Sequence, residues 1–239
     1  MRRSWLQILT RSPFYLAKNL KQGRQVVELL KIALDTPESV FVDVGSHKGE
    51  VLSMALKIAP KGDHYAFEAI PAFFDKLSAE FKNYAYLQNV AVTNYVGTTM
   101  FNFVESNPSL SGIKQRDYPK SEKISEINLK TTTLDRALSN AQRVDLIRID
   151  VEGGEYDVID GAKQTIFKHQ PIILFEHQQG AADYYDANPD KIWDILIDQL
   201  GMKLYTLNSY LESKKPITKS MLQLLFDTGQ ETLFIADFN

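Results

Sequence analysis

Residues 40–49 read VFVDVGSHKG, a run of β-favouring residues that reaches an acidic residue and then breaks into a glycine turn. The apolar residues of this run predict a strand that is covered on both faces, as in a parallel sheet. Gly45 and Gly49 lack a Cβ, so we expect the backbone of the turn to approach a bound ligand closely. The stretch therefore predicts the first strand and the ligand-binding turn of a nucleotide-type pocket, with Asp43 at the strand end.

The glycine spacing argues against a pyrophosphate ligand. A dinucleotide fingerprint has glycines at relative positions one, three and six, but counting from Gly45 the last two of these places hold His47 and Glu50. An NAD-dependent oxidoreductase is therefore an alternative that this turn disfavours.

A second acidic residue makes the expected ligand more specific. Residues 63–68 (DHYAFE) predict the next strand, with Glu68 at the carboxyl end, where parallel-sheet proteins hold a ribose by its hydroxyls. A carboxylate at this place would repel a 2′-phosphate. A ligand with a ribose, no phosphate and a positive centre that Asp43 would favour is S-adenosylmethionine. Without Glu68, the sequence Asp-x-Gly at a strand end is equally well interpreted as ordinary turn chemistry.

Further motifs follow in a fixed order along the chain: DVGxxxG at 43–49, FExxP at 67–71, TLD at 133–135, IDVEGxE at 149–155 and a strand ending in FEH at 172–177. Over residues 39 to 177 this order resembles the FkbM-type methyltransferase family. The resemblance implies a class I methyltransferase that uses S-adenosylmethionine to methylate a hydroxyl of a sugar, glycan or secondary metabolite. The family commonly has Asn where this chain has His47, a difference that we expect to alter how the methionine end of the donor is held.

Strand and helix patterns alternate along the chain and predict the fold class. Strands are expected at 40–44, 64–68, 84–92, 145–150, 172–176, 203–207 and 232–236, and helices at 50–58, 71–81, 155–167 and 191–200. This alternation predicts a Rossmann-like α/β fold, with a mostly parallel, twisted seven-stranded sheet and helices on both faces. A further strand is expected at 98–104. The polar stretch 105–130 is expected to be a loop that covers the acceptor.

Composition narrows the classes of function. The chain has 239 residues with 44% hydrophobic content, which suits one α/β domain, expected at 39–239. A formal net charge of −3 gives no support to a nucleic-acid substrate, and the absence of cysteine excludes disulfides and cysteine metal sites. No stretch approaches the roughly 18 apolar residues that span a bilayer. We therefore expect a soluble, cytoplasmic protein that acts on a small-molecule or glycan acceptor.

The N-terminal region carries an uneven charge. Residues 1–24 contain six basic residues and no acidic one, with aromatic and aliphatic residues between them. We expect residues 1–38 to form a mainly helical extension that packs on the domain or on another subunit, because Pro13 interrupts any continuous helical face. Peripheral contact of residues 1–24 with an anionic membrane is the alternative, and a non-catalytic protein that binds the cofactor or a membrane is a further one.

The predicted site residues lie at the carboxyl ends of the strands. The expected cofactor-binding residues are Asp43, Gly45, His47, Gly49, Glu68, Asn89, Val90 and Asp150. His177 is the expected general base for a hydroxyl acceptor, because an imidazole has an ordinary pKa of about 6.5. Asp150 and Glu152 flank the same mouth and are the other expected catalytic residues, which orient the acceptor or share its proton. A hydrogen-bonded structural histidine at a strand end is the alternative for His177. A divalent metal held by Asp150, Glu152 and Glu176 is a less favoured mechanism.

Overall fold

The computed structural model describes residues 20–118 and 122–239. Most of the basic N-terminal segment, residues 1–19, lies outside this range, so its expected role stays a prediction. Within the described ranges, every helix is too short or too polar to cross a bilayer.

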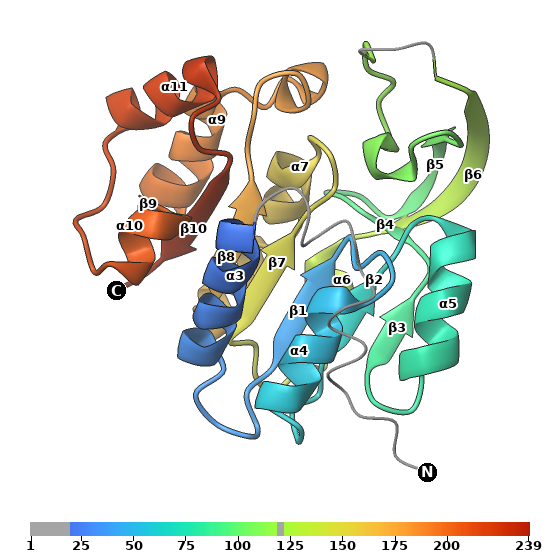
Figure 1. Cartoon of the computed structure of the whole chain (residues 1–239), viewed down its shortest axis with the longest axis horizontal. Coiled ribbons are helices and arrows are strands. Elements are labelled where there is room, and N and C mark those ends of the chain that lie inside the picture. The colour runs from blue at the N-terminus through green and yellow to red at the C-terminus, as the bar shows by residue number, and fades with distance from the viewer. Residues whose placement is uncertain (1–19, 119–121) are drawn as a thin grey trace.

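A seven-stranded sheet forms the centre of the molecule (Figure 1). Its strands are β1 (Phe41–Val44), β2 (Tyr65–Phe67), β3 (Tyr86–Gln88), β7 (Leu146–Ile149), β8 (Ile172–Glu176), β9 (Lys203–Thr206) and β10 (Leu233–Asp237). They lie in the order β3-β2-β1-β7-β8-β10-β9. Strand β10 pairs antiparallel with β8 and β9, and the other pairs of this sheet are parallel, so the mostly parallel sheet predicted from the sequence is confirmed.

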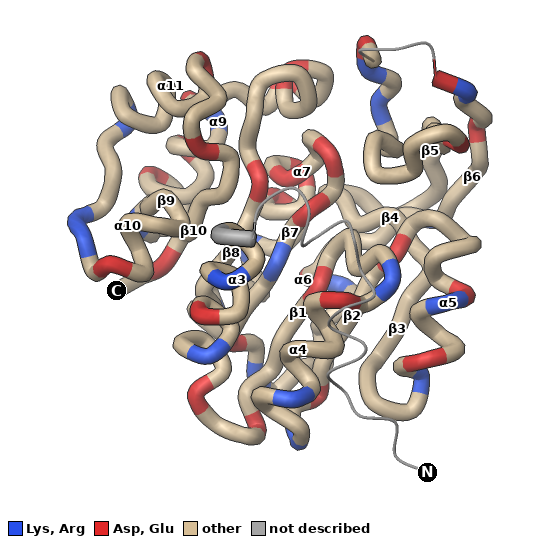
Figure 2. The backbone as a smooth tube through the Cα atoms, viewed as in Figure 1, with Lys and Arg blue, Asp and Glu red and all other residues tan. Residues whose placement is uncertain are grey.

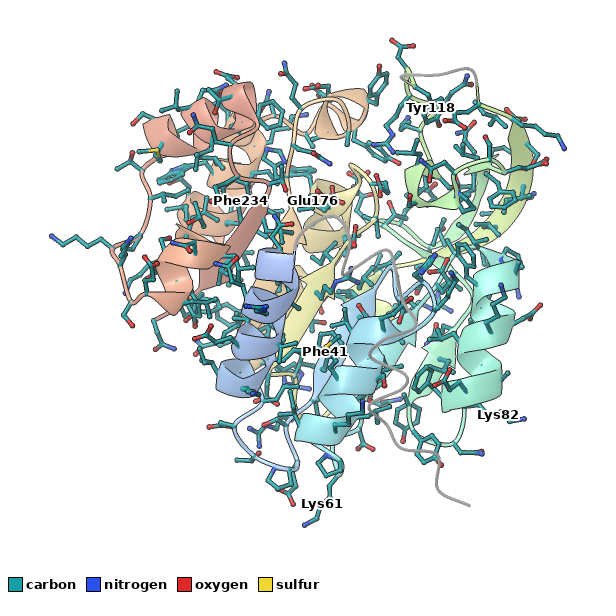
Figure 3. All side chains as sticks on the ribbon, viewed as in Figure 1. Phe41, Lys61, Lys82, Tyr118, Glu176 and Phe234 are labelled. Atoms are coloured by element: carbon teal, nitrogen blue, oxygen red, sulfur yellow. The ribbon has the colours of Figure 1, made fainter. Side chains whose placement is uncertain are left out.

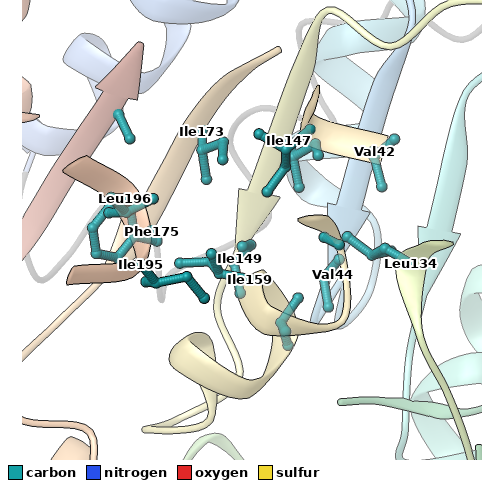
Figure 4. Close-up of a cluster of buried hydrophobic side chains, with 14 of the residues drawn as sticks. Val42, Val44, Leu134, Ile147, Ile149, Ile159, Ile173, Phe175, Ile195 and Leu196 are labelled. Atoms are coloured by element: carbon teal, nitrogen blue, oxygen red, sulfur yellow. The ribbon is translucent and has the colours of Figure 1, made fainter. Parts of the chain in front are cut away.

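The central strands are buried on both faces because their side chains alternate between two apolar clusters. Val42 and Ile147, which are register partners, belong to one cluster (Figure 4). The preceding pair, Phe41 and Leu146, belongs to the cluster on the opposite face. A strand that meets a core on both sides needs apolar residues at nearly every position. This requirement explains the mostly apolar run at residues 40–44.

Helices cover both faces of the sheet, as predicted (Figure 1). One face packs against α3 (Leu20–Ala33), α4 (Glu50–Ile58), α5 (Pro71–Phe81) and α10 (Leu207–Leu211). The other face packs against α6 (Leu134–Ala137), α7 (Glu155–Asp160), α8 (Lys163–His169), α9 (Pro189–Trp193), the π-helical turn η3 (Asp194–Gln199) and α11 (Lys219–Thr228). Helix α3 contributes Val26, Leu29 and Leu30 to the core, so this part of the predicted extension is packed onto the domain.

The helix expected at 155–167 is instead two helices, α7 and α8. The break lies at Gly161, where an added Cβ would come 2.4 Å from the carbonyl oxygen of Thr93. The carboxylate of Asp135 then accepts hydrogen bonds from the backbone N–H groups of Gln164 and Thr165, at 3.2 and 2.7 Å. These bonds satisfy N–H groups at the start of α8, so the chain begins a second helix rather than continuing the first.

A second, three-stranded sheet lies beside the first and consists of β4 (Ala91–Val92), β5 (Gly97–Val104) and β6 (Ile124–Thr132). Strand β6 corrects the expectation of a polar loop over 105–130. It pairs antiparallel with β5 over residues 124–131, and only Leu129, Thr131 and Thr132 among its residues are buried. Because one face of this strand meets solvent, its sequence is polar enough to resemble a loop.

Candidate functional site

A cavity of about 550 Å³ lies between the carboxyl ends of the central strands and the second sheet. Small-molecule sites in proteins have volumes of roughly 300–1,000 Å³, and in open α/β sheets they lie outside the carboxyl ends of the strands. Gly45, His47, Glu68, Val90 and Asp150 line one side of this cavity. Residues of the second sheet and of the loop 105–118, with the 3₁₀ turn η1 (Pro108–Leu110), line the other side.

The packing of the fold, and not only a bound ligand, requires a glycine at position 45. Its φ is 82°, and an added Cβ would lie 1.9 Å from the carbonyl oxygen of Asp150. The glycine therefore lets the end of β1 approach the end of β7, rather than opening space for a ligand alone. Gly49, also expected at the cofactor site, does not line the cavity: an added Cβ there would meet Leu77 and Phe81 of α5.

Glu68 is a buried carboxylate, with 5% of its surface exposed, at the wall of the cavity. Its Oε2 accepts a hydrogen bond from the backbone N–H of His47 at 2.7 Å, and its Oε1 accepts one from that of Ile70 at 2.8 Å. Burial raises the pKa of Glu68 to about 7. An ionised carboxylate has about four acceptor sites, so two remain for hydroxyl donors.

Asn89 and Val90 differ in position. Val90 lines the cavity, whereas Asn89 does not. The Asn89 amide donates hydrogen bonds to the carbonyl oxygens of Glu68 and Ala69, at 2.8 and 3.0 Å. Asn89 thus fixes the backbone that carries the Glu68 carboxylate.

Asp43, expected to face the cofactor, is fully buried behind the cavity wall. Its Oδ1 accepts a hydrogen bond from Nη1 of Arg148 at 2.9 Å, and its Oδ2 accepts one from Ser46 at 2.8 Å. Arg148 also donates to the carbonyl oxygen of Gly45 at 3.3 Å and, through Nη2, to Asp150. Asp43 and Arg148 are register partners on β1 and β7, which is why this buried pair forms. Burial raises the pKa of Asp43, and Arg148 opposes that shift.

Glu152 lies at the far side of the cavity, held by Arg116 of the loop 105–118. Nη2 of Arg116 donates to Glu152 at 3.0 Å and to the carbonyl oxygen of Leu110 at 3.1 Å, and Arg116 is only 7% exposed. The hydroxyls of Tyr185 and Tyr184 accept hydrogen bonds from the backbone N–H groups of Lys114 and Asp117. These contacts fasten the loop 105–118 over the cavity. No local sequence signal identified Arg116, because its partner is 36 residues away.

The three carboxylates proposed as metal ligands do not converge. Within the part of the chain that the structure describes, no three His, Cys, Asp or Glu side chains are placed to hold a metal ion. Glu176 lies at the end of β8 (Figure 3), opposite Leu233 of β10, and does not line the cavity. Burial, followed by the charges of Asp150 and Glu152, raises the pKa of Glu176 well above its ordinary value.

His177, the expected general base, also lies outside the cavity lining. Its ring is stacked on Phe226 of α11, with the centroids 4.7 Å apart, and only 1% of the residue is exposed. Burial lowers the pKa of His177 to about 4, and its Nε2 has no hydrogen-bond partner among the described residues. This buried position gives a catalytic role of His177 no support, and that role stays a prediction. The hydrogen bond that the structural alternative expects is missing at Nε2 among the described residues.

The sequence of this chain is similar to those of known methyltransferases. The family model described as "Methyltransferase FkbM domain" matches residues 43–204, which is more than half of the chain. A protein named 2-O-methyltransferase NoeI, from Sinorhizobium fredii (strain NBRC 101917 / NGR234), is 26% identical over 168 residues, which cover 63% of this chain and 66% of that protein. The match thus spans just under two thirds of the relative's length.

A solved structure is also similar. The methyltransferase FkbM from Methylobacillus flagellatus KT superposes with a TM-score of 0.51 at 13% identity, over 84% of this chain and 44% of that one. At this level of identity the likeness shows a shared fold.

Proposed function

Because the chain belongs to the FkbM methyltransferase family, we propose that the cavity binds S-adenosylmethionine and that the protein methylates a hydroxyl of a sugar, glycan or secondary metabolite. The family assignment supplies the reaction class. The name of the relative NoeI, a 2-O-methyltransferase, supports oxygen as the methyl acceptor.

The observation that carries the proposal is the Glu68 carboxylate at the cavity wall. Its two backbone hydrogen bonds fix both oxygens in place, the residue lines the cavity, and two of its about four acceptor sites are left for other donors. Such a group suits the two hydroxyls of a ribose. Val90 and Ala91, which line the cavity next to it, offer an apolar surface for a base. The donor-binding side therefore comprises Glu68, Val90, Ala91 and the turn 45–48.

The opposite side suits an uncharged acceptor that bears hydroxyls. It is lined by side chains that exchange hydrogen bonds with hydroxyls: Asn107, Ser109, Ser111, Glu152, Asp157 and Tyr185. Two cations line the cavity among the described residues: Lys48 belongs to the donor-side turn 45–48, and Arg148 is already bonded to Asp43 and Asp150. Lys and Arg are the side chains that proteins use to bind phosphate and carboxylate groups, and these two lie away from the acceptor side or are paired. A sugar-like acceptor without an acidic group fits this composition best.

S-Adenosylmethionine supplies a methyl group on a positively charged sulfur. The protein's part is to hold the acceptor oxygen in line with that group, and such positioning can lower a barrier by about 7–11 kcal/mol. Asp150 and Glu152 flank the meeting point of the two sides and would orient the acceptor hydroxyl. The bridge through Arg148 and the bond from Arg116 keep these two carboxylates in fixed positions.

Titration calorimetry with S-adenosylhomocysteine and with NAD tests donor binding, and we expect only the first ligand to bind. Incubation with methyl-labelled S-adenosylmethionine and a panel of glycosides and hydroxylated metabolites tests the transfer. The panel should contain matched neutral, uronic-acid and phosphorylated sugars, and label should enter the neutral ones. Binding of NAD without S-adenosylhomocysteine would contradict the proposal.

A further inference from the structure

Carboxylates gather around the cavity near β7 and α7, where Figure 2 shows a concentration of acidic residues. Five carboxylates from the described residues line the cavity: Glu50, Glu68, Asp150, Glu152 and Asp157. A carboxylate that already accepts hydrogen bonds from cations or N–H groups is a weaker proton acceptor, because those bonds stabilise its ionised form. The partners of each carboxylate therefore indicate which one is suited to take a proton.

Four of the five carboxylates have partners. Asp150 is bonded to Arg148, and Glu152 is bonded to Arg116 at 3.0 Å. Glu68 accepts hydrogen bonds from the backbone N–H groups of His47 and Ile70, and it lies on the donor side, where the proposed ribose would take its remaining acceptor sites. Glu50 lies 3.6 Å from Nδ1 of His47, also on the donor side, and its pKa is lowered.

Asp157 differs from the other four carboxylates. It lies in the first turn of α7 and lines the cavity on the acceptor side, which Tyr185 also lines. No donor or cation within the described ranges makes a hydrogen bond or ion pair with its carboxylate. Burial raises the pKa of Asp157, followed by the charge of Asp160 on the same helix. Lys114 from the loop 105–118 and Lys191 from α9 act in the opposite direction at longer range.

We propose that Asp157 is the general base of the reaction, a catalytic residue that accepts the proton of the acceptor hydroxyl. This assignment rests on the proposed transfer of a methyl group to oxygen. As the acceptor oxygen forms its bond to the methyl carbon, the carbon–sulfur bond breaks and its electron pair stays on the sulfur. The hydroxyl proton passes to the Asp157 carboxylate and then to solvent, so charge and atoms balance.

Two other groups near the acceptor side are less suited to this role. The Tyr185 hydroxyl already accepts a hydrogen bond from the N–H of Lys114, and burial raises the pKa of Tyr185 to about 12, so it stays neutral. The His177 imidazole is packed on Phe226 outside the cavity lining. Asp157 is the acceptor-side carboxylate whose oxygens are available to a hydroxyl.

The test compares Asp157→Asn with Asp160→Asn, which makes the same change on the same helix. Asp160 is bonded to Lys163 and Asn94 and does not line the cavity. Transfer from labelled S-adenosylmethionine to the neutral glycosides of the panel is measured across pH, and S-adenosylhomocysteine affinity is measured by calorimetry. A carboxyl titration by carbon NMR of the ligand-free wild type and Asp157→Asn gives a readout that needs no acceptor.

We expect Asp157→Asn to slow transfer by about 10²- to 10⁴-fold, the usual contribution of a positioned base. Its S-adenosylhomocysteine affinity should stay within about twofold of the wild type. Asp160→Asn removes a charge that raises the pKa of Asp157, and it should keep the wild-type rate within a few-fold at a pH above the Asp157 titration. The NMR signal lost in Asp157→Asn should titrate above the ordinary aspartate range. A rate kept by Asp157→Asn, or a signal titrating at or below that range, would overturn the assignment. Failure of the wild type to bind S-adenosylhomocysteine would instead overturn the proposed function.

Discussion

Glu68→Gln is the substitution that most directly tests how the cavity holds a ribose. In the wild type, the two open acceptor sites of the carboxylate would receive two hydroxyl donors, each worth about 1.5–3 kcal/mol for a charged acceptor. Loss of both bonds amounts to about 3–6 kcal/mol, which corresponds to about 10²- to 10⁴-fold in the dissociation constant. Glutamine keeps the volume of the side chain. Its amide nitrogen, however, would face the N–H of either His47 or Ile70, so a shifted backbone is a second cause of lost affinity for the ligand.

Paired ligands separate the two causes. Affinities for S-adenosylhomocysteine and for its 2′,3′-dideoxy analogue are measured by calorimetry at pH 8, above the pKa of about 7 that burial gives Glu68. The wild type should prefer the natural ligand strongly, and Glu68→Gln should lose most of that preference. Glu50→Gln, at a cavity-lining residue that contacts His47, serves as the matched control and should keep the preference.

The pH dependence gives an independent check of Glu68. Hydroxyls that donate to the ionised carboxylate lower its pKa, so binding should release a proton and tighten as pH rises toward about 7. Above that pH the affinity should level off. An equal loss of affinity for both ligands in Glu68→Gln, together with a wild-type affinity that does not change from pH 5.5 to 8, would refute ribose binding by this residue.

Four further predictions concern other parts of the molecule. Burial raises the pKa of Glu155 to about 8 from an ordinary 4.5, so the folded chain holds the carboxyl proton more firmly than the unfolded chain does. The free energy of unfolding should therefore fall as pH rises between these two values, by up to about 1.4 kcal/mol per pH unit. Glu155→Gln should flatten that part of the urea-unfolding stability profile; an unchanged slope would count against it. Gly45→Ala should lower the melting temperature more than Gly201→Ala, because both have positive φ but only Gly45 faces a backbone atom. Equal losses of melting temperature in the two variants would show that the backbone relaxes easily where Gly45 approaches β7. His177→Phe should keep methyl transfer within a few-fold, and a hundredfold loss in a normally folded variant would restore its catalytic role. Deletion of residues 1–19 should preserve S-adenosylhomocysteine affinity, which calorimetry measures. Deletion through Ala33 should instead lower the melting temperature, which thermal unfolding measures, because it removes the buried side chains of α3.

The sequence predicted the central sheet well because buried parallel strands and amphipathic helices leave strong local patterns. The bounds of β8, α4 and α5 agree with the expected ones to the residue. Helix α11 was missed, although Thr218 caps its start and Gly229 follows its end. The polar sequence of β6 concealed a strand for a different reason: its pairing with β5 is set by a partner about 30 residues away, which a local pattern does not reveal.

The candidate site was predicted less completely, because position in sequence fixes the strand end but not the direction of each side chain. Asp43 and His177 lie at strand ends as expected, yet one is buried under Arg148 and the other under Phe226. Asp157, which lies within a helix, carries no motif that separates it from the many exposed acids of this chain. Its distinction is the absence of a partner among the described residues, and this requires three-dimensional contacts.

The way the second sheet joins the first has a consequence for the divergence of such enzymes. Strand β4, which follows the last strand of the main sheet on that side, pairs with the last two residues of β6, so the chain that leaves β4 returns beside it at the end of β6. The segment between them supplies the η1 side of the acceptor wall, including Asn107 and Ser109, but none of the strands of the seven-stranded sheet. A segment whose two ends are neighbours can be exchanged for one of another length without moving the donor-binding strands. Chimaeras that swap residues 93–130 between relatives should thus change which acceptor is methylated while leaving donor affinity as it was.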